Sequence, residues 1–439
     1  MRDEAISPSD AHSRLRTAAS GRRPLASFLD WQSFARNCWI LLIVGLAIFA
    51  LVRPYSHSVY DIYVGASRRW IAGEDIYVRT REYYRYSPLF AVLLTPLAVL
   101  PDGASAALWK LLNCGVFAWG LIAWGRRLVD ASWTQNERAA LLLLAMPLSL
   151  HSMYNSQANL MMLGSLLLGL AAAAEEKWNR SALWLAWGTL IKGYPLALAM
   201  LVGALFPRRF VPRYLAALAL GLLLPFAAQR PAVVVAQYQS WLHHLADSTE
   251  IMRERLRSID QLFVIYSQPL SQQTFAMIGM AGGALVFLLC MHARWQGRTR
   301  RELLTLTFLW FSLWVVLCGP ATESCTYVVA APAIAWAVIE VWRRGRPAYE
   351  RAAMVASLLM MGPAVTDMFG KLIRNFANEH GSQPVGALLL LAWLVAEATR
   401  SRGQGTGDRG QGTGDRNTSE RPKERKPPTP NPQPLTPNP

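Results

Sequence analysis

The 439-residue sequence has little charge for its length: Asp, Glu, Lys and Arg make up 16% of it, whereas apolar residues make up 53%. Soluble domains carry about 25% charged residues, so this composition excludes an ordinary soluble protein. The apolar residues come in runs of about 15 to 25, the length of a membrane span. They do not alternate with period two, which excludes a membrane barrel. The sequence therefore predicts an all-α polytopic membrane protein.

Cysteine is also scarce, and no Cys/His spacing is typical of a zinc site. His243 and His244 are adjacent, so on a helix their rings would point about 100° apart. Cys318 and Cys325 flank an outer turn, and a disulfide between them remains open. We expect neither a metal nor a cofactor.

Basic residues are in excess, with 44 Lys and Arg against 28 acids. They cluster beside the apolar runs, as at Arg208, Arg209 and Arg213, which is typical of cytoplasmic membrane edges and not of a nucleic-acid surface. We therefore expect a multi-pass protein of the cell membrane with both termini in the cytoplasm, and no nucleic-acid partner.

About twelve transmembrane or re-entrant helices are expected. With that number, Arg126, Arg127 and Arg138 would lie on the outer side, against the positive-inside rule, unless one segment is re-entrant. The course of the chain between 101 and 207 therefore remains open. The predicted segments are 37–53, 87–101, 104–125, 139–152, 158–175, 181–206, 214–229, 273–292, 302–319, 325–342, 352–369 and 384–399.

The chain divides into three parts. Residues 1–36 form a polar cytoplasmic segment, and residues 37–400 form the membrane domain, with outer loops at 54–86 and 230–272. Residues 401–439 contain a repeated heptapeptide and a Pro-rich end, so they cannot bury a core and are expected to form a disordered cytoplasmic tail.

The first outer loop carries the sharpest candidate, Asp61, in the aromatic run Val59–Tyr63. A partly desolvated carboxylate has a raised pKa and can accept a proton from a sugar hydroxyl. Asp61 as a helix cap, or as a partner of Arg68 or Arg69, is the alternative. Asp75 follows Gly73 and is more typical of a turn.

Lys192 lies inside an apolar segment, where a charge is costly. Gly193 and Pro195 indicate a broken helix, so Lys192 either extends to the membrane surface or meets a phosphate. Further polar candidates are the amides Gln157 and Asn159, the second-loop residues Arg255, Asp260 and Gln261, and Glu323 at the outer end of the ninth segment.

Several of these residues stand in ordered motifs: Asp61–Ala66, Gly73–Tyr77, Tyr86–Phe90, Ser156–Asn159 and Lys192–Pro195. In order and spacing they resemble glycosyltransferase family 87, the polyprenol-phosphate-mannose-dependent mannosyltransferases of the C-type membrane superfamily. Ser156 stands where the family has Gly, and Ile259–Leu262 matches the family's Asn-Gln-Ser only loosely. The resemblance covers roughly residues 37–400.

The resemblance implies a C-type glycosyltransferase architecture and an inverting, metal-independent transfer on the outer face. The partners implied are a polyprenyl-phosphate sugar donor, carrying mannose or a similar hexosyl or pentosyl unit, a glycolipid or glycan acceptor, and the lipid bilayer. Asp61 is the implied catalytic base. The implied substrate-binding residues are Tyr63, Arg69, Asp75, Tyr86, Gln157, Asn159, Lys192, Tyr194, Arg255, Asp260, Gln261 and Glu323.

A secondary transporter or flippase of lipid-linked sugars is the alternative function. Transporters tend to have two related halves with functional groups at the midplane. Here the halves differ, and carboxylates such as Asp61 and Glu323 gather toward the outer surface, which favours the transferase.

Overall fold

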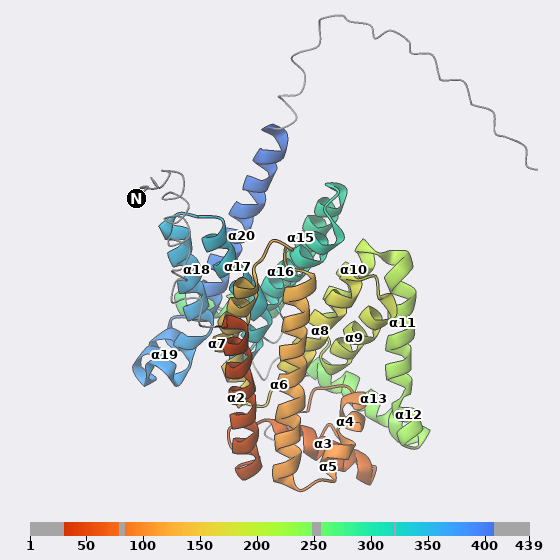
Figure 1. Ribbon diagram of the computed structural model, residues 1–439. Coiled ribbons are helices and arrows are strands. Elements are labelled where there is room, and N and C mark those ends of the chain that lie inside the picture. The colour runs from red at the N-terminus through yellow and green to blue at the C-terminus, as the bar shows by residue number, and fades with distance from the viewer. Residues whose placement is uncertain (1–29, 79–83, 248–255, 320–321, 408–439) are drawn as a thin grey trace, which may run out of the picture. The chain divides into compact units, whose positions relative to one another are not determined.

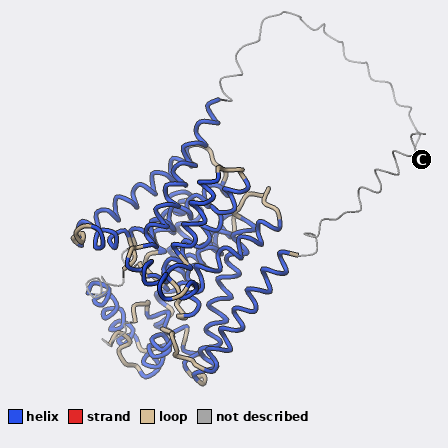
Figure 2. The backbone as a smooth tube through the Cα atoms, turned by 90° about the vertical axis from the view of Figure 1, so that its left-hand side faces the viewer, coloured by secondary structure: helices blue, strands red, loops and turns tan. Residues whose placement is uncertain are grey.

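The computed structural model describes residues 30–78, 84–247, 256–319 and 322–407, and these form helices and loops without a strand (Figure 2). The prediction of an all-α protein is thus confirmed. Seven helices within these described ranges are long and apolar enough to cross a membrane, which makes the chain a multi-pass membrane protein. They are Trp31–Val52, Asp102–Arg127, Pro207–Ala228, Gln272–Trp295, Arg300–Cys318, Ser324–Arg343 and Ser382–Arg400.

The chain forms two compact units, of which the first extends to Ala392. Its longer helices run between two ends (Figure 1). They are α2 (Trp31–Val52), α6 (Asp102–Arg127), α7 (Gln135–Tyr154), α8 (Asn159–Ala174), α11 (Pro207–Leu223), α15 (Gln272–Trp295), α16 (Arg300–Cys318), α17 (Ala331–Arg343) with the preceding 3-10 helix η3 (Ser324–Ala330), α18 (Ala348–Met361) and the start of α20 (Ser382–Gly407).

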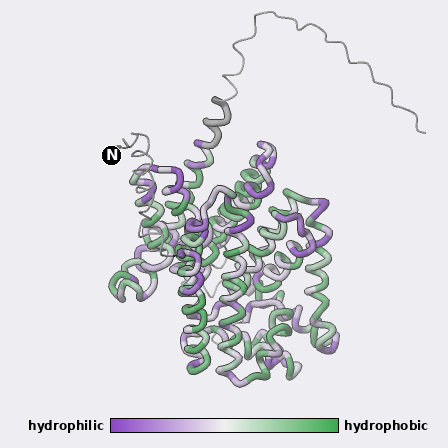
Figure 3. The backbone as a smooth tube through the Cα atoms, viewed as in Figure 1, coloured by the Kyte–Doolittle hydropathy of each residue, from purple (hydrophilic) through white to green (hydrophobic). Residues whose placement is uncertain are grey.

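One end, which we call the basic end, gathers the arginine-rich connections (Figure 3). Arg127 pairs with Glu175, while Arg209 and Arg300 both pair with Glu176, so the connections after α6, α8, α10 and α15 meet there. Capping boxes, Thr134 with Glu137 among them, begin α7 and α16 at the same end.

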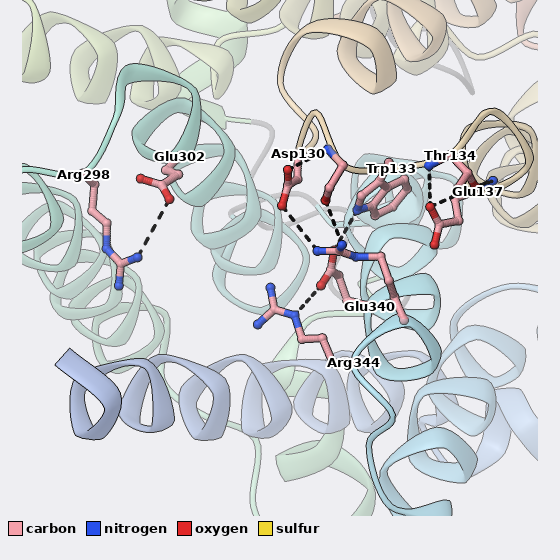
Figure 4. Close-up of polar contacts among 10 residues, drawn as sticks. Asp130, Trp133, Thr134, Glu137, Arg298, Glu302, Glu340 and Arg344 are labelled. Atoms are coloured by element: carbon pink, nitrogen blue, oxygen red, sulfur yellow. Dashed lines mark hydrogen bonds and ion pairs between the residues drawn. The ribbon is translucent and has the colours of Figure 1, made fainter. Parts of the chain in front are cut away.

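A buried carboxylate secures this end. Glu340, 1% exposed, accepts hydrogen bonds from Trp133 Nε1 at 2.8 Å and from Arg343 Nε at 3.1 Å, and it also pairs with Arg344 (Figure 4). These contacts tie the α6–α7 connection to the last turn of α17. A buried charge needs such partners, because an unpaired one costs several kcal/mol, roughly 3–5.

The segment 87–101 is not a full span, so of the two courses left open for 87–125 the structure has the one with a single crossing, α6, after a shorter segment. That segment forms only α4 (Pro88–Leu93) and α5 (Thr95–Ala98), both too short to cross a bilayer. Pro96 lies within the first two positions of α5 and lacks a backbone N–H, so the two helices do not continue into one. With this segment removed, Arg127 lies with Arg209 and Arg300 at the basic end, and the conflict over charge disappears.

The predicted segment 181–206 is two helices, α9 (Trp178–Ile191) and α10 (Pro195–Leu205). Between them Lys192 is extended, with φ −138° and ψ 142°. The start of α9 adjoins Glu176, and the carbonyl of Leu205 accepts a hydrogen bond from Arg294. Helices α9 and α10 therefore form a hairpin. Its two ends lie at the basic end, and its tip, at Lys192, lies inside the protein.

The opposite end, which we call the α3 end, contains the two predicted outer loops (Figure 1). Both are largely helical. The first contains α3 (Tyr60–Ala72), and the second contains α13 (Pro231–Asp247) and α14 (Ile259–Tyr266) after the short α12 (Pro225–Ala228). Two short 3-10 helices, η4 (Pro363–Val365) and η5 (Asp367–Phe369), and then α19 (Lys371–Glu379) connect α18 to α20.

Between the two ends α8 is almost wholly buried and crosses α6 closely. A Cβ atom on Gly164 would lie 2.5 Å from the carbonyl oxygen of Val116, so only glycine allows this approach. Small residues at helix crossings are how membrane helices bring their backbones together.

The second compact unit begins at Trp393, within α20. Its helix continues to Gly407, beyond the boundary at 400 expected from the sequence. Residues 408–439, the larger part of the predicted tail, lie outside the described residues, as does most of the predicted N-terminal segment.

Candidate active site

Two buried tyrosines form the base of the site at the α3 end. The hydroxyls of Tyr63, on α3, and Tyr86, before α4, are 2.8 Å apart, and the Tyr63 hydroxyl accepts a hydrogen bond from the backbone N–H of Ala158. Burial raises the pKa of both phenols, so they remain protonated at neutral pH and can donate. This pair joins the first outer segment to the start of α8.

Lys192 lies against the same pair. Its Nζ is 5.9 Å from the centroid of the Tyr86 ring, a cation–π distance. The Tyr194 hydroxyl, which interacts electrostatically with Tyr86, is buried and has no hydrogen-bond partner among the described residues. The tip of the α9–α10 hairpin thus offers a cation and a free polar group side by side.

Glu323 supplies the opposite charge. It precedes η3, and its backbone N–H donates to Thr326 Oγ1, in the first turn of that helix, at 3.2 Å. It interacts electrostatically with Lys192, with Arg257 and with His151 in the last turn of α7. The carboxylate therefore lies among cationic or protonatable groups from three different segments.

Arg257 is held beside Glu323 by its own backbone. Its N–H donates to the carbonyl of Thr322 at 2.6 Å, and its carbonyl accepts from the Tyr327 hydroxyl at 2.7 Å. Analysis of the sequence did not single out Arg257, Tyr327 or His151. The one signal for Arg257 was the series of arginines at every second position before α14, at 253, 255 and 257. Nothing in the sequence distinguished Arg257 from the other two.

Asp61 lies in the first turn of α3, on the exposed side of that helix. Partial burial raises the pKa of its carboxyl group, although the backbone N–H groups of Asp61 and Ile62 act in the opposite sense. Arg68 pairs instead with Asp102 at 2.5 Å, so it is not the partner of Asp61. The geometry suits a carboxylate that is open to an incoming hydroxyl.

Both predicted amide residues make structural hydrogen bonds, Asn159 through its side chain and Gln157 through its backbone carbonyl. Asn159 Nδ2 donates to the carbonyl of Cys325 at 3.1 Å, while its Oδ1 is buried without a partner among the described residues. The backbone carbonyl of Gln157 accepts from Asn113 Nδ2 at 2.9 Å. Both residues fix the start of α8 against α6 and η3. Ser156, in place of the family's Gly, has φ 58°, a left-handed conformation that glycine adopts without strain.

The remaining predicted site residues are not brought to the tyrosine pair by any contact that the structure shows among its described residues. Arg69 is in the last turn of α3, and Asp75 accepts from the N–H of Tyr77 at 3.0 Å, as a turn residue does. Asp260 accepts from the N–H of Leu270 at 3.1 Å, and Gln261 Nε2 donates to the carbonyl of Asn378 at 3.1 Å. Arg255 lies outside the described residues.

Within the part of the chain that the structure describes, no three His, Cys, Asp or Glu side chains are grouped so that they could hold a metal ion. Cys318 and Cys325 both carry free thiols. Around the tyrosine pair the structure brings together Lys192, Arg257, Glu323 and phenolic donors, and α3 carries the exposed Asp61 two residues before Tyr63.

None of the curated proteins matches this chain. The fold is similar to the crystal structure of ArnT from Cupriavidus metallidurans bound to undecaprenyl phosphate, at 15% identity and a TM-score of 0.40, over 80% of this chain and 76% of that one. The model of glycosyltransferase family 87 matches residues 84–320, more than half of the sequence. The chain is a membrane glycosyltransferase and belongs to glycosyltransferase family 87.

Proposed function

We propose that this enzyme transfers a mannosyl or similar hexosyl or pentosyl unit from a polyprenyl phosphate to a glycolipid or glycan acceptor, with inversion and without a metal. The observation that carries the proposal is the position of Lys192 at the tip of the α9–α10 hairpin, over the Tyr86 ring and beside the unpaired Tyr194 hydroxyl. A cation and a donor held in this way suit the phosphate of a lipid-linked sugar.

In the proposed reaction an acceptor hydroxyl attacks C1 of the sugar while the bond from C1 to the phosphate oxygen breaks. The hydroxyl proton passes to the carboxylate of Asp61, which its exposed position leaves accessible. Lys192 and Arg257 stabilise the departing polyprenyl phosphate, whose negative charge grows as the bond breaks. Glu323 interacts electrostatically with both cations before the donor binds.

The proposed orientation of the protein in the membrane follows from the distribution of its basic residues. The basic end lies in the cytoplasm together with both termini, and the α3 end lies outside the cell membrane. Residues 37–400 then form a C-type glycosyltransferase domain whose segments 54–86 and 230–272 enclose the site.

The test is transfer by the purified protein in nanodiscs. Radiolabelled polyprenyl-phosphate mannose and a membrane glycolipid extract are supplied, and labelled products are extracted and separated. We expect labelled product from the lipid-linked donor and none from GDP-mannose. Product formed from GDP-mannose alone, in the absence of any lipid-linked sugar, would overturn the proposed donor class.

A further inference from the structure

Helix α19 has two exposed faces of opposite character. Leu372, Ile373 and Phe376 are 84%, 45% and 61% exposed, and at 100° per residue they share one arc of the helix. Lys371, Asn375 and Glu379 are also exposed and share an adjacent arc, centred about 110° from the apolar one. Such a helix is strongly amphipathic, yet neither arc is covered by the residues that the structure describes.

The side of α19 that the protein covers lies between these arcs. Ala377 is 4% exposed, Asn378 is partly buried, and Arg374 pairs with Asp367 at 2.7 Å. A helix that docks in a protein groove buries the middle of its apolar arc. Here the covered side is a boundary between apolar and polar arcs, which is the geometry of a helix lying in a plane where an apolar phase meets water.

Helix α14 extends the same surface. Gln261 of α14 binds the carbonyl of Asn378, and the Tyr266 hydroxyl donates to the carbonyl of His380 at 3.2 Å. Phe263, Val264 and Tyr266 are 36%, 50% and 64% exposed. The two short helices therefore form one layer, and its exposed aromatic side chains are typical of the membrane–water interface.

We infer that α14 and α19 lie flat in the interface of the lipid bilayer at the α3 end, with the apolar arc of α19 among acyl chains and its polar arc toward headgroups and water. The bilayer is adjacent, because α19 connects α18 to α20, and the first part of α20 is a membrane span. Arg257 precedes α14 by two positions, so the layer also holds Arg257 at the level of the headgroups.

Spin labels on single cysteines in phosphatidylcholine nanodiscs test this inference without reference to catalysis. Cys38 and Cys318 are first replaced by Ala, since the other three cysteines are buried. Labels at Leu372 and Phe376 are compared with matched controls at Lys371 and Asn375 on the same helix. Collision with oxygen, which concentrates in acyl chains, and with a water-soluble nickel complex is measured for each label.

We expect labels at Leu372 and Phe376 to collide more with oxygen, and labels at Lys371 and Asn375 to collide more with the nickel complex. Val264→Cys on α14 should behave as Leu372→Cys does. Equal access of the nickel complex to all four α19 positions would overturn the inference. So would immobile labels at 372 and 376 that neither reagent reaches, because that result would show a protein partner or a second copy on this face.

Discussion

The ammonium group of Lys192 lies over the ring of Tyr86, with Nζ 5.9 Å from the ring centroid. The contact joins the tip of a hairpin that starts from the basic end to the segment between α3 and α4 at the other end. Tyr86 also shares a hydrogen bond with Tyr63 of α3. Contacts therefore connect Lys192, through the two tyrosines, to the helix that carries Asp61.

Replacing this cation should weaken use of the donor more than it harms folding. For Lys192→Met we expect the KM for polyprenyl-phosphate mannose to rise about 10- to 100-fold, the loss of one charged hydrogen bond of about 1.5–3 kcal/mol. Lys192→Arg should not restore it, because a planar guanidinium differs in shape from an ammonium. Lys177→Met, which removes an exposed partner of Glu175 at the basic end, is the matched control. An unchanged KM in Lys192→Met would make Lys192 a structural residue.

The pH dependence of the transfer rate should follow the ionisation of the Asp61 carboxyl group. Only the ionised carboxylate can accept the acceptor's proton, and partial burial raises its pKa. The rate should therefore fall as the pH decreases through a pKa above about 3.9, the value for an exposed aspartate. The measurement is kcat/KM against pH for wild type. An acid limb at or below that value, or none at all, would argue against Asp61 as the base.

The crossing of α6 and α8 should depend on glycine. A methyl group at Gly164 would meet the carbonyl oxygen of Val116 at 2.5 Å, so Gly164→Ala should force the two helices apart. We expect a loss of about 1–3 kcal/mol in the free energy of unfolding, measured by thermal unfolding in detergent. Gly115→Ala, also on α6, meets nothing within 4 Å and should be neutral or stabilising. Equal behaviour of the two variants would contradict the close crossing.

The orientation can be read from thiol labelling in intact cells, again with Cys38 and Cys318 replaced by Ala. Glu74→Cys, exposed at the α3 end, should react with a membrane-impermeant maleimide. Lys177→Cys, at the basic end, should react only after the cells are permeabilised. The reverse pattern would place the site in the cytoplasm and remove the case for an externally presented lipid-linked donor.

Hydropathy predicted the membrane class and most of the helices, because apolar runs as long as a membrane span are uncommon in soluble proteins. It could not distinguish a span from a hairpin in 181–206, since α9 and α10 together are as apolar and as long as one span. The local signals at Lys192, Gly193 and Pro195 did indicate the break, and the structure has it there. For 87–101, the prolines at 88 and 96 were the signal against a single span.

The site was predictable only in part, because contacts between distant segments decide it. Lys192, Tyr63, Tyr86 and Glu323 were all singled out from the sequence, and the structure brings them together. Asp260 and Gln261 are equally polar, yet their side chains bind backbone groups of Leu270 and Asn378. A sequence pattern shows which side chains can bind a sugar or a phosphate, but not which of them already have partners.

The most direct test of the account is the initial rate of sugar transfer by Asp61→Asn, measured in nanodiscs with radiolabelled polyprenyl-phosphate mannose. The substitution keeps the shape of the side chain and removes the proton acceptor, so we predict a fall of about 10²- to 10⁴-fold with donor binding unchanged. Glu74→Gln, an exposed carboxylate just beyond the C-terminal end of α3, should keep the wild-type rate. A rate for Asp61→Asn within a few-fold of wild type would contradict the account.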